Sequence, residues 1–303
     1  MFFVFVLIFL SSCAARSLDE NSEEIATPQN KEFNAYWYTG KAEVNVYNLE
    51  QARYGEIHKG KAIRIFVTED FLVDKQVKKE SMTQDESTSV MKMNFIKKFP
   101  TGIYDYSMMS SVFTPIDIAK YRKTLKTTTS SQEWCGHTFS QLNLQGNKYE
   151  FTGHSYFENE GEQNFSLDYA FLEDEIWNRM RLNPMGLPQG KLKLIPSSMN
   201  ARLKHYDLKA EDATAGLTLK VDEDQQEFFV YTIKYENGRE LLIQAHSQFP
   251  HRITYWEDSY ISGFGPNRKK LTTKASLDKS VKEAYWGQNA NRFQSMRKDL
   301  GLD

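Results

Sequence analysis

The sequence predicts a mainly β protein of the α+β type. We expect a large antiparallel curved sheet, a half-barrel or a sandwich, with one packed helix near 166–181 and a helical C-terminal tail. Two observations support this fold class. Short runs that alternate apolar and polar residues recur along the chain, as in strands with one buried face. Aromatic residues make up 14% of the sequence, and aromatic side chains favour strands. Roughly fourteen short strands, or about 40% of the residues, would place the chain well above the usual strand fraction.

Residues 1–12 have the pattern of a secretory signal peptide. Phe2–Leu10 is too short to span a bilayer, which needs roughly 20 residues, and matches an h-region. The residues LSSC at 10–13 resemble the lipobox of bacterial lipoproteins, in which the cysteine receives the acyl chains. We therefore expect lipid attachment at Cys13, and Ala14 after it favours the outer membrane. The alternatives are an ordinary cleaved signal and an apolar start with a cysteine there by chance.

Residues 13–31 are polar and predict a flexible tether. Two β-rich halves, 32–182 and 190–303, follow it and could form one continuous domain. The chain carries 38 Lys and Arg against 40 Asp and Glu, a net charge of −2, which argues against a nucleic acid partner because phosphate binding requires a basic face. No internal apolar run reaches transmembrane length, so we expect the membrane contact to come from the anchor.

Alternating runs predict several strands in the first half. The run AIRIFV at 62–67 is the strongest of them, and the charged residues 73–88 indicate a loop. Strands are expected at 33–38, 43–47, 62–67, 90–99, 104–113 and 125–130.

A hairpin over residues 133–158 is the clearest local unit, because Gly146 and Asn147 stand between two alternating runs. This turn fixes the pairing, so Phe139 should lie opposite His154. Side chains on a strand alternate between the two faces. The expected core face carries Trp134, Leu142, Leu144, Tyr149, Phe151 and Phe157, and the polar face carries Cys135, His137, His154 and Glu158.

Residues 166–181 have the best helical pattern, because Leu167, Ala170 and Trp177 recur at helical spacing. Ser166 is a suitable N-cap, and a proline at 184 stops the helix. Asp174 interrupts the apolar face of this helix. Further strands are expected at 192–195, 201–208, 217–221, 228–235, 240–245, 253–256 and 271–275, followed by a broken helix from 277 onward.

Cys135 and His137 could form a reactive thiol and its base, because a cysteine nucleophile needs a group that takes its proton. His154 could serve instead, with Glu158 to orient the imidazole, and the same residue types could bind zinc. However, side chains two residues apart on a strand are separated by about 7 Å. We therefore assign no catalytic residue, no metal and no cofactor, and interpret these side chains as a polar face.

Three further segments are weaker candidates. Arg53 and Tyr54 lie in a turn between two strands, and Glu69 and Asp70 end the next strand, so these groups could line a site. The run Tyr104-Asp105-Tyr106 suits stacking on a sugar. The run GFGP at 263–266 is too short for a phosphate-binding loop.

Four segments resemble a family of uncharacterised bacterial lipoproteins that are often labelled "septum formation inhibitor Maf". They are QARYGEIHKGKAIRIFVTEDF, KKFPTGIYDYSMMSSVFTP, TTSSQEWCGHTF and LEDEIWNRMR, and the resemblance covers most of 36–260. True Maf proteins are α/β nucleotide pyrophosphatases with a Ser-Pro-Arg-Arg-like loop. This chain has no such loop, so the resemblance implies a lipoprotein and does not carry over that activity.

These observations predict a lipid-anchored protein of the cell envelope, at the outer membrane. We expect it to bind an apolar or glycan ligand or to act in envelope assembly. The alternative is a thiol-dependent hydrolase or transferase that uses Cys135 with His137 or His154.

Overall fold

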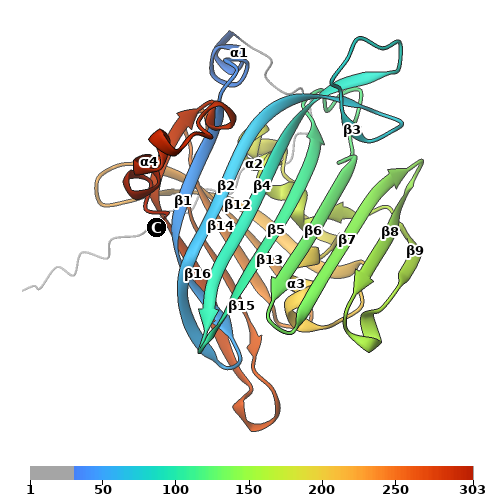
Figure 1. Ribbon diagram of the computed structural model, residues 1–303, viewed down its shortest axis with the longest axis vertical. Helices are drawn as coiled ribbons and strands as arrows, with labels where there is room; N and C mark the ends of the chain where they lie inside the picture. Colours follow the sequence, from blue (N-terminus) through green and yellow to red (C-terminus); the bar gives the residue numbers. More distant parts are fainter. Residues whose placement is uncertain (1–30, 303) are drawn as a thin grey trace, which may run out of the picture.

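The structure, a computed structural model, describes residues 31–302. The chain forms one large, strongly curved sheet that does not close on itself (Figure 1). Strands make up 55% and helices 16% of the described residues, so the predicted mainly β fold class is confirmed. The expected signal peptide at 1–12, Cys13 and nearly all of the tether lie outside the described residues.

Sixteen strands of the described chain belong to this sheet. Their order is β10-β11-β12-β13-β14-β15-β16-β1-β2-β4-β5-β6-β7-β8-β9, with β3 paired to β2. The β1–β16 ladder joins the halves expected at 32–182 and 190–303. The strands are β1 (Ala42–Arg53), β2 (Glu56–Leu72), β3 (Val77–Lys78), β4 (Ser87–Thr101), β5 (Tyr104–Pro115), β6 (Lys126–Glu133), β7 (Gly136–Gln145), β8 (Lys148–Ser155), β9 (Gln163–Asp168), β10 (Phe171–Leu172), β11 (Gly190–Ile195), β12 (Glu211–Val221), β13 (Glu227–Tyr235), β14 (Glu240–His246), β15 (Ile253–Ser262) and β16 (Lys269–Glu283).

Helices are short in the described chain, and several differ from the expected elements. The expected strand at 33–38 is helix α1, and the expected strand at 201–208 begins inside helix α3. The C-terminal tail is helical only after β16, which includes residues 277–283. The helices are α1 (Lys31–Trp37), η1 (Glu158–Glu160), α2 (Glu173–Leu182), η2 (Pro184–Gly186), α3 (Ser198–Lys204), η3 (Gly265–Asn267), η4 (Tyr285–Gly287), η5 (Asn291–Phe293) and α4 (Ser295–Asp299).

The predicted hairpin is present as β7 and β8. Gly146 and Asn147 form its turn, and Phe139 lies opposite His154. The structure differs from the prediction at residues 134 and 135, which were expected in the first strand of the hairpin. Trp134 and Cys135 form the turn between β6 and β7, so Trp134 is 70% exposed and does not belong to the core face.

The expected helix at 166–181 begins too early. Residues 163–168 form β9, where Ser166 lies opposite Glu150 and donates a hydrogen bond to its carboxylate at 2.6 Å. Phe165 and Leu167 pack on a small apolar cluster beside the sheet. The edge of the sheet thus takes the first part of the segment, and α2 starts at Glu173.

Helix α2 lies inside the curve of the sheet, and all ten of its residues are buried (Figure 1). Trp177 and Met180 belong to the main apolar core. Asn178 donates hydrogen bonds of 3.0 Å to the carbonyl of Met91 and to the hydroxyl of Thr114. These contacts fasten α2 to β4 and β5. Within residues 31–302, no helix is long and apolar enough to span a bilayer.

Candidate functional site

A small cavity of about 30 Å³, called the inner cavity below, lies inside the curve of the sheet between α2 and α3. Its wall is unusual because it carries many ionisable groups, which proteins rarely bury unless they are paired. Clusters of buried ionisable groups are typical of functional sites. The charged residues that line it are Arg64, Lys97, Glu173, Asp174, Arg239 and Asp258.

Arg64 is the most unusual group of this inner cavity. The residue is fully buried, and its guanidinium carbon lies 3.6 Å from the ring centre of Phe95 and 3.4 Å from that of Trp177. One nitrogen, Nη1, lies 3.1 Å from the sulfur of Met93, whereas Nε and Nη2 have no hydrogen-bond partner among the described residues. Burial lowers the pKa of Arg64 to about 9. Two donors are therefore free for an acceptor that occupies the cavity.

Lys97 and Asp174 add two groups that titrate near neutral pH. Burial lowers the pKa of Lys97 to about 8, and its ammonium donates a hydrogen bond to Gln51 at 3.2 Å. Burial and the neighbouring charge of Glu173 raise the pKa of Asp174 to about 6. Because each charge is marginally stable, a bound ligand can change either protonation state at small cost.

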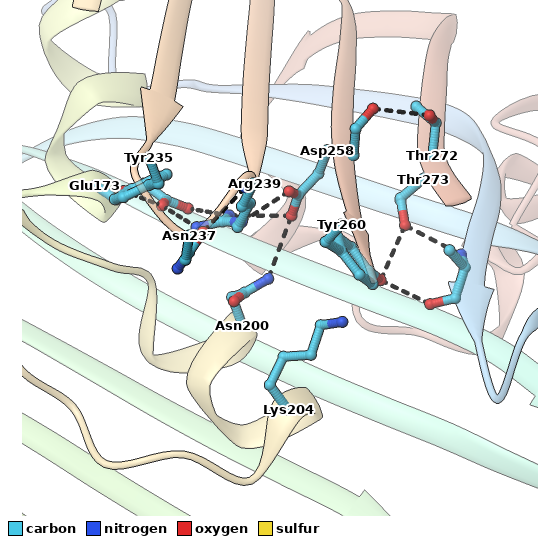
Figure 2. Close-up of polar contacts among 12 residues, drawn as sticks. Glu173, Asn200, Lys204, Tyr235, Asn237, Arg239, Asp258, Tyr260, Thr272 and Thr273 are labelled. Carbon is cyan, nitrogen blue, oxygen red and sulfur yellow. Dashed lines mark hydrogen bonds and ion pairs between the residues drawn. The ribbon is translucent and has the colours of Figure 1, made fainter. Parts of the chain in front are cut away.

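Three of the charged residues that line the inner cavity, Glu173, Arg239 and Asp258, form one network of ion pairs (Figure 2). Arg239 donates to Glu173 at 2.7 Å and to Asp258 at 2.8 Å. Tyr235 donates to Glu173 at 2.6 Å. Asn200 reaches down from α3 and donates to Asp258 at 3.4 Å. This network fixes the acidic groups and links them to α3.

A second cavity, of about 300 Å³ and called the outer cavity below, lies at the C-terminal end of α3. Leu203 and Tyr260 line both cavities and separate them. Arg53 donates a hydrogen bond to the carbonyl of Leu203, and Lys204 donates one to the carbonyl of Ile261. The C-terminal end of α3 is therefore fastened by two basic side chains at the boundary between the cavities.

The four residues of the expected polar face do not meet in one site. Cys135 is exposed in its turn, and its amide donates to Glu133 at 3.4 Å. A hydrogen bond to Glu133 and the charge of that carboxylate raise the pKa of the thiol, which disfavours the nucleophilic thiolate.

The remaining three residues of that face lie apart from the thiol. His154 pairs with Glu162 at 2.6 Å, His137 is exposed on β7, and Glu158 begins η1. No group of three or more potential metal ligands gathers within residues 31–302. This geometry does not support thiol catalysis. The thiol-dependent enzyme is therefore still a prediction without a test.

The weaker candidates of the sequence come closer to the cavities. Arg53 donates to Tyr106 at 3.1 Å, and the hydroxyls of Tyr54 and Tyr106 are 2.7 Å apart. Tyr104 donates to Tyr54 at 3.0 Å. Residues 263–265 of the GFGP loop line the outer cavity, as does Arg53. Glu69 and Asp70 instead line a separate cavity of about 460 Å³ beside α1.

The inner cavity was not predicted, although two signals pointed to it. Asp174 interrupts the apolar face of the expected helix, and Arg64 stands in the middle of the apolar run AIRIFV. A charged side chain within an apolar pattern that predicts burial is unfavourable unless it is paired or hydrogen-bonded. Comparison of the chain with protein-family models, with curated proteins and with solved structures finds no match.

Proposed function

We propose that this chain is a lipid-anchored protein of the cell envelope that binds a glycan ligand in the inner and outer cavities, which adjoin at Leu203 of α3. One observation carries the proposal: the buried guanidinium of Arg64 lies between two aromatic rings and keeps two donors without partners in the described chain. A buried donor without a partner costs about 1–3 kcal/mol. A ligand oxygen that accepts from Arg64 would offset that cost.

The lining favours a glycan over a purely apolar ligand. Phe95, Trp177 and Trp256 form aromatic parts of the wall, whereas the charged groups beside them can form hydrogen bonds. Binding sites usually combine apolar and aromatic walls with a few placed polar groups. An apolar ligand would leave the two free donors of Arg64 desolvated and without an acceptor, which is unfavourable.

The sizes of the two cavities indicate how a ligand would enter. About 30 Å³ holds little more than water, whereas about 300 Å³ is at the lower limit of ordinary ligand pockets. Leu203 of α3 stands between them. We infer that a ligand enters the outer cavity and reaches Arg64 when α3 moves aside.

Anchoring rests on the lipobox-like residues LSSC and on the resemblance to bacterial lipoproteins. Replacement of Cys13 by Ala should abolish labelling of the cell-expressed protein with radioactive palmitate and release it from the outer-membrane fraction. Labelling that persists in Cys13→Ala would contradict the assignment.

Glycan binding is tested with the full-length chain in detergent on an array of bacterial and host glycans, followed by calorimetry with the best ligand. Arg64→Lys keeps the charge and removes the planar fork, so affinity should fall at least tenfold. Arg292→Lys makes the same change at an exposed site and should leave binding unchanged. Failure of every glycan to bind, or equal affinity of Arg64→Lys, would contradict the proposal.

A further inference from the structure

The outer cavity is strongly basic. Among the described residues that line it, Arg53, Lys204 and Arg268 are cationic and none carries a carboxylate. None of these three side chains forms an ion pair with a described carboxylate. Cationic side chains that converge without counter-charges indicate a place for an anion. The feature differs from the inner cavity, where acidic and basic groups alternate.

Arg53 is the fixed member of this basic set. It is 6% exposed, and its guanidinium donates to Tyr106 at 3.1 Å and to Tyr54 at 3.3 Å. The guanidinium carbon lies 4.2 Å from the ring centre of Tyr54. Its Nε is buried and has no hydrogen-bond partner within the described chain. The side chain is therefore held in place with one donor unused.

Lys204 is the member that belongs to α3. Its ammonium lies 3.7 Å from the ring centre of Tyr260. Burial lowers the pKa of Lys204 to about 8. The charge of Asp258 raises this pKa, whereas the positive charges of Arg53, Arg239 and Arg268 lower it further. A bound anion would relieve this repulsion. Because Lys204 is on α3 and Arg53 is on the sheet, one anion between them would hold α3 in place.

Two turns set the distance between Arg53 and Arg268. Gly55 has φ +82° and Gly263 has φ +92°, and a Cβ at either would come within 2.6 Å or 2.5 Å of the carbonyl oxygen of Asn267. Only glycine permits this approach and this backbone conformation. The β15–β16 turn thus packs directly on the β1–β2 turn, which places Arg268 beside the cavity that Arg53 lines.

We propose that the outer cavity binds an anionic group of the ligand, a phosphate, sulfate or carboxylate held by Arg53, Lys204 and Arg268. The inference rests on the proposed glycan binding and narrows it to an anionic ligand. Arginine forks suit oxyanions because they donate parallel hydrogen bonds. Side chains, and not backbone amides, would bind the anion. This agrees with the 263–266 loop, which is too short to form a phosphate-binding loop. A sugar phosphate and an anionic lipid headgroup share this chemistry.

The test uses the full-length chain in phosphatidylcholine nanodiscs and measures binding by calorimetry. Glucose 6-phosphate should bind at least tenfold more tightly than glucose, and inorganic phosphate should compete with it. Arg268→Gln removes one of the three cations and should remove most of that gain. The replacement should not disturb the fold, because Arg268 is exposed and forms no described ion pair. Lys204→Gln should act in the same direction. Arg292→Gln is the matched control and should bind as the unmodified chain does.

The lipid headgroup is tested in a second arm. Nanodiscs that contain phosphatidylglycerol should prevent binding of glucose 6-phosphate if the natural anion belongs to a lipid, and should leave it unchanged if the anion is soluble. Either result supports the anion site and assigns its source.

Two results would overturn the inference. In the first, neutral glycans bind and the phosphate group adds nothing, which rejects the anion site but keeps the proposed glycan function. In the second, glucose 6-phosphate binds equally to the unmodified chain, Arg268→Gln and Lys204→Gln, which places the anion elsewhere. Loss of all glycan binding, neutral and charged, would instead reject the proposed function itself.

Discussion

Helices α2 and α3 lie on the same side of the sheet but are held in different ways. Every residue of α2 is buried. Its Asn178 bonds to the backbone of β4, its Arg181 pairs with Glu43 of β1, and its Glu173 pairs with Arg239. Met199 and Leu203 of α3 also pack in the core, but its residues line cavities of about 30, 70 and 300 Å³. Polar side chains on separate strands add to its attachment. We infer that α2 is a permanent part of the core and that α3 is the element able to move.

The buried charges of α2 contribute to its fixed position. Arg181 donates to both oxygens of Glu43, at 2.6 and 2.8 Å, and neither residue is more than 1% exposed. Burial alone would raise the pKa of Glu43, but Arg181 lowers it to about 2. The pair is therefore fully ionised at neutral pH and joins α2 to β1.

The largest expected effect comes from breaking that pair. Arg181→Met leaves the Glu43 carboxylate buried without its partner, and the free energy of unfolding should fall by about 3–5 kcal/mol. Urea denaturation measures it. The double variant Glu43→Gln with Arg181→Met removes both charges and should recover much of the loss. A single variant within 1 kcal/mol of the unmodified chain would show that α2 is not held by this pair.

The second effect concerns Asp174, which joins α2 to the start of α3. Its carboxylate accepts hydrogen bonds from Ser197 and from the amide of Ser198, and its pKa is raised to about 6. A raised carboxyl pKa means that the folded chain binds a proton more tightly than the unfolded chain. The stability from Asp174 is therefore present below about pH 4 and is lost as the pH rises through about 6.

Asp174→Asn should remove this loss, because the amide stays neutral. At pH 7 the variant should be more stable than the unmodified chain by on the order of 2 kcal/mol, and at pH 4 the two should be nearly equal. Denaturation at both pH values measures the difference. Asp168→Asn, at a side chain that is 93% exposed, is the control and should change neither value. A less stable Asp174→Asn at pH 7 would contradict the assignment.

Local patterns and long-range assembly explain what the sequence could predict. The β7–β8 turn was predictable because Gly146 and Asn147 encode it locally. Helix α3 was not, because its seven residues have little period of their own and depend on distant partners such as Asp258. Arg64, Lys97 and Asp174 come from β2, β4 and α2, and only the curvature of the sheet brings them together.

A smaller effect, on amide hydrogen exchange, should distinguish α3 from α2 directly. Tyr206 donates to Asn200 within the α3 region at 2.9 Å, so Tyr206→Phe should cost about 1 kcal/mol. Amides of 198–204 should then exchange about fivefold faster, with no change in α2. Hydrogen–deuterium exchange followed by mass spectrometry measures both helices. Tyr231→Phe removes a hydrogen bond to the carbonyl of Pro188, which lies outside α3, and should leave 198–204 unchanged. Equal acceleration in α2 would show that the helices open together.

The smallest expected effect is the pH dependence of anion binding on α3. Lys204 has a pKa of about 8 in the free protein, so it is charged at pH 7 and mostly neutral at pH 9. Inorganic sulfate, which does not titrate in this range, should bind several-fold more weakly at pH 9 because one of three cations is lost. Lys204→Arg keeps its charge at both pH values and should show little difference between them. If sulfate affinity falls equally in both proteins, the titrating group lies elsewhere and α3 contributes no charge to the site.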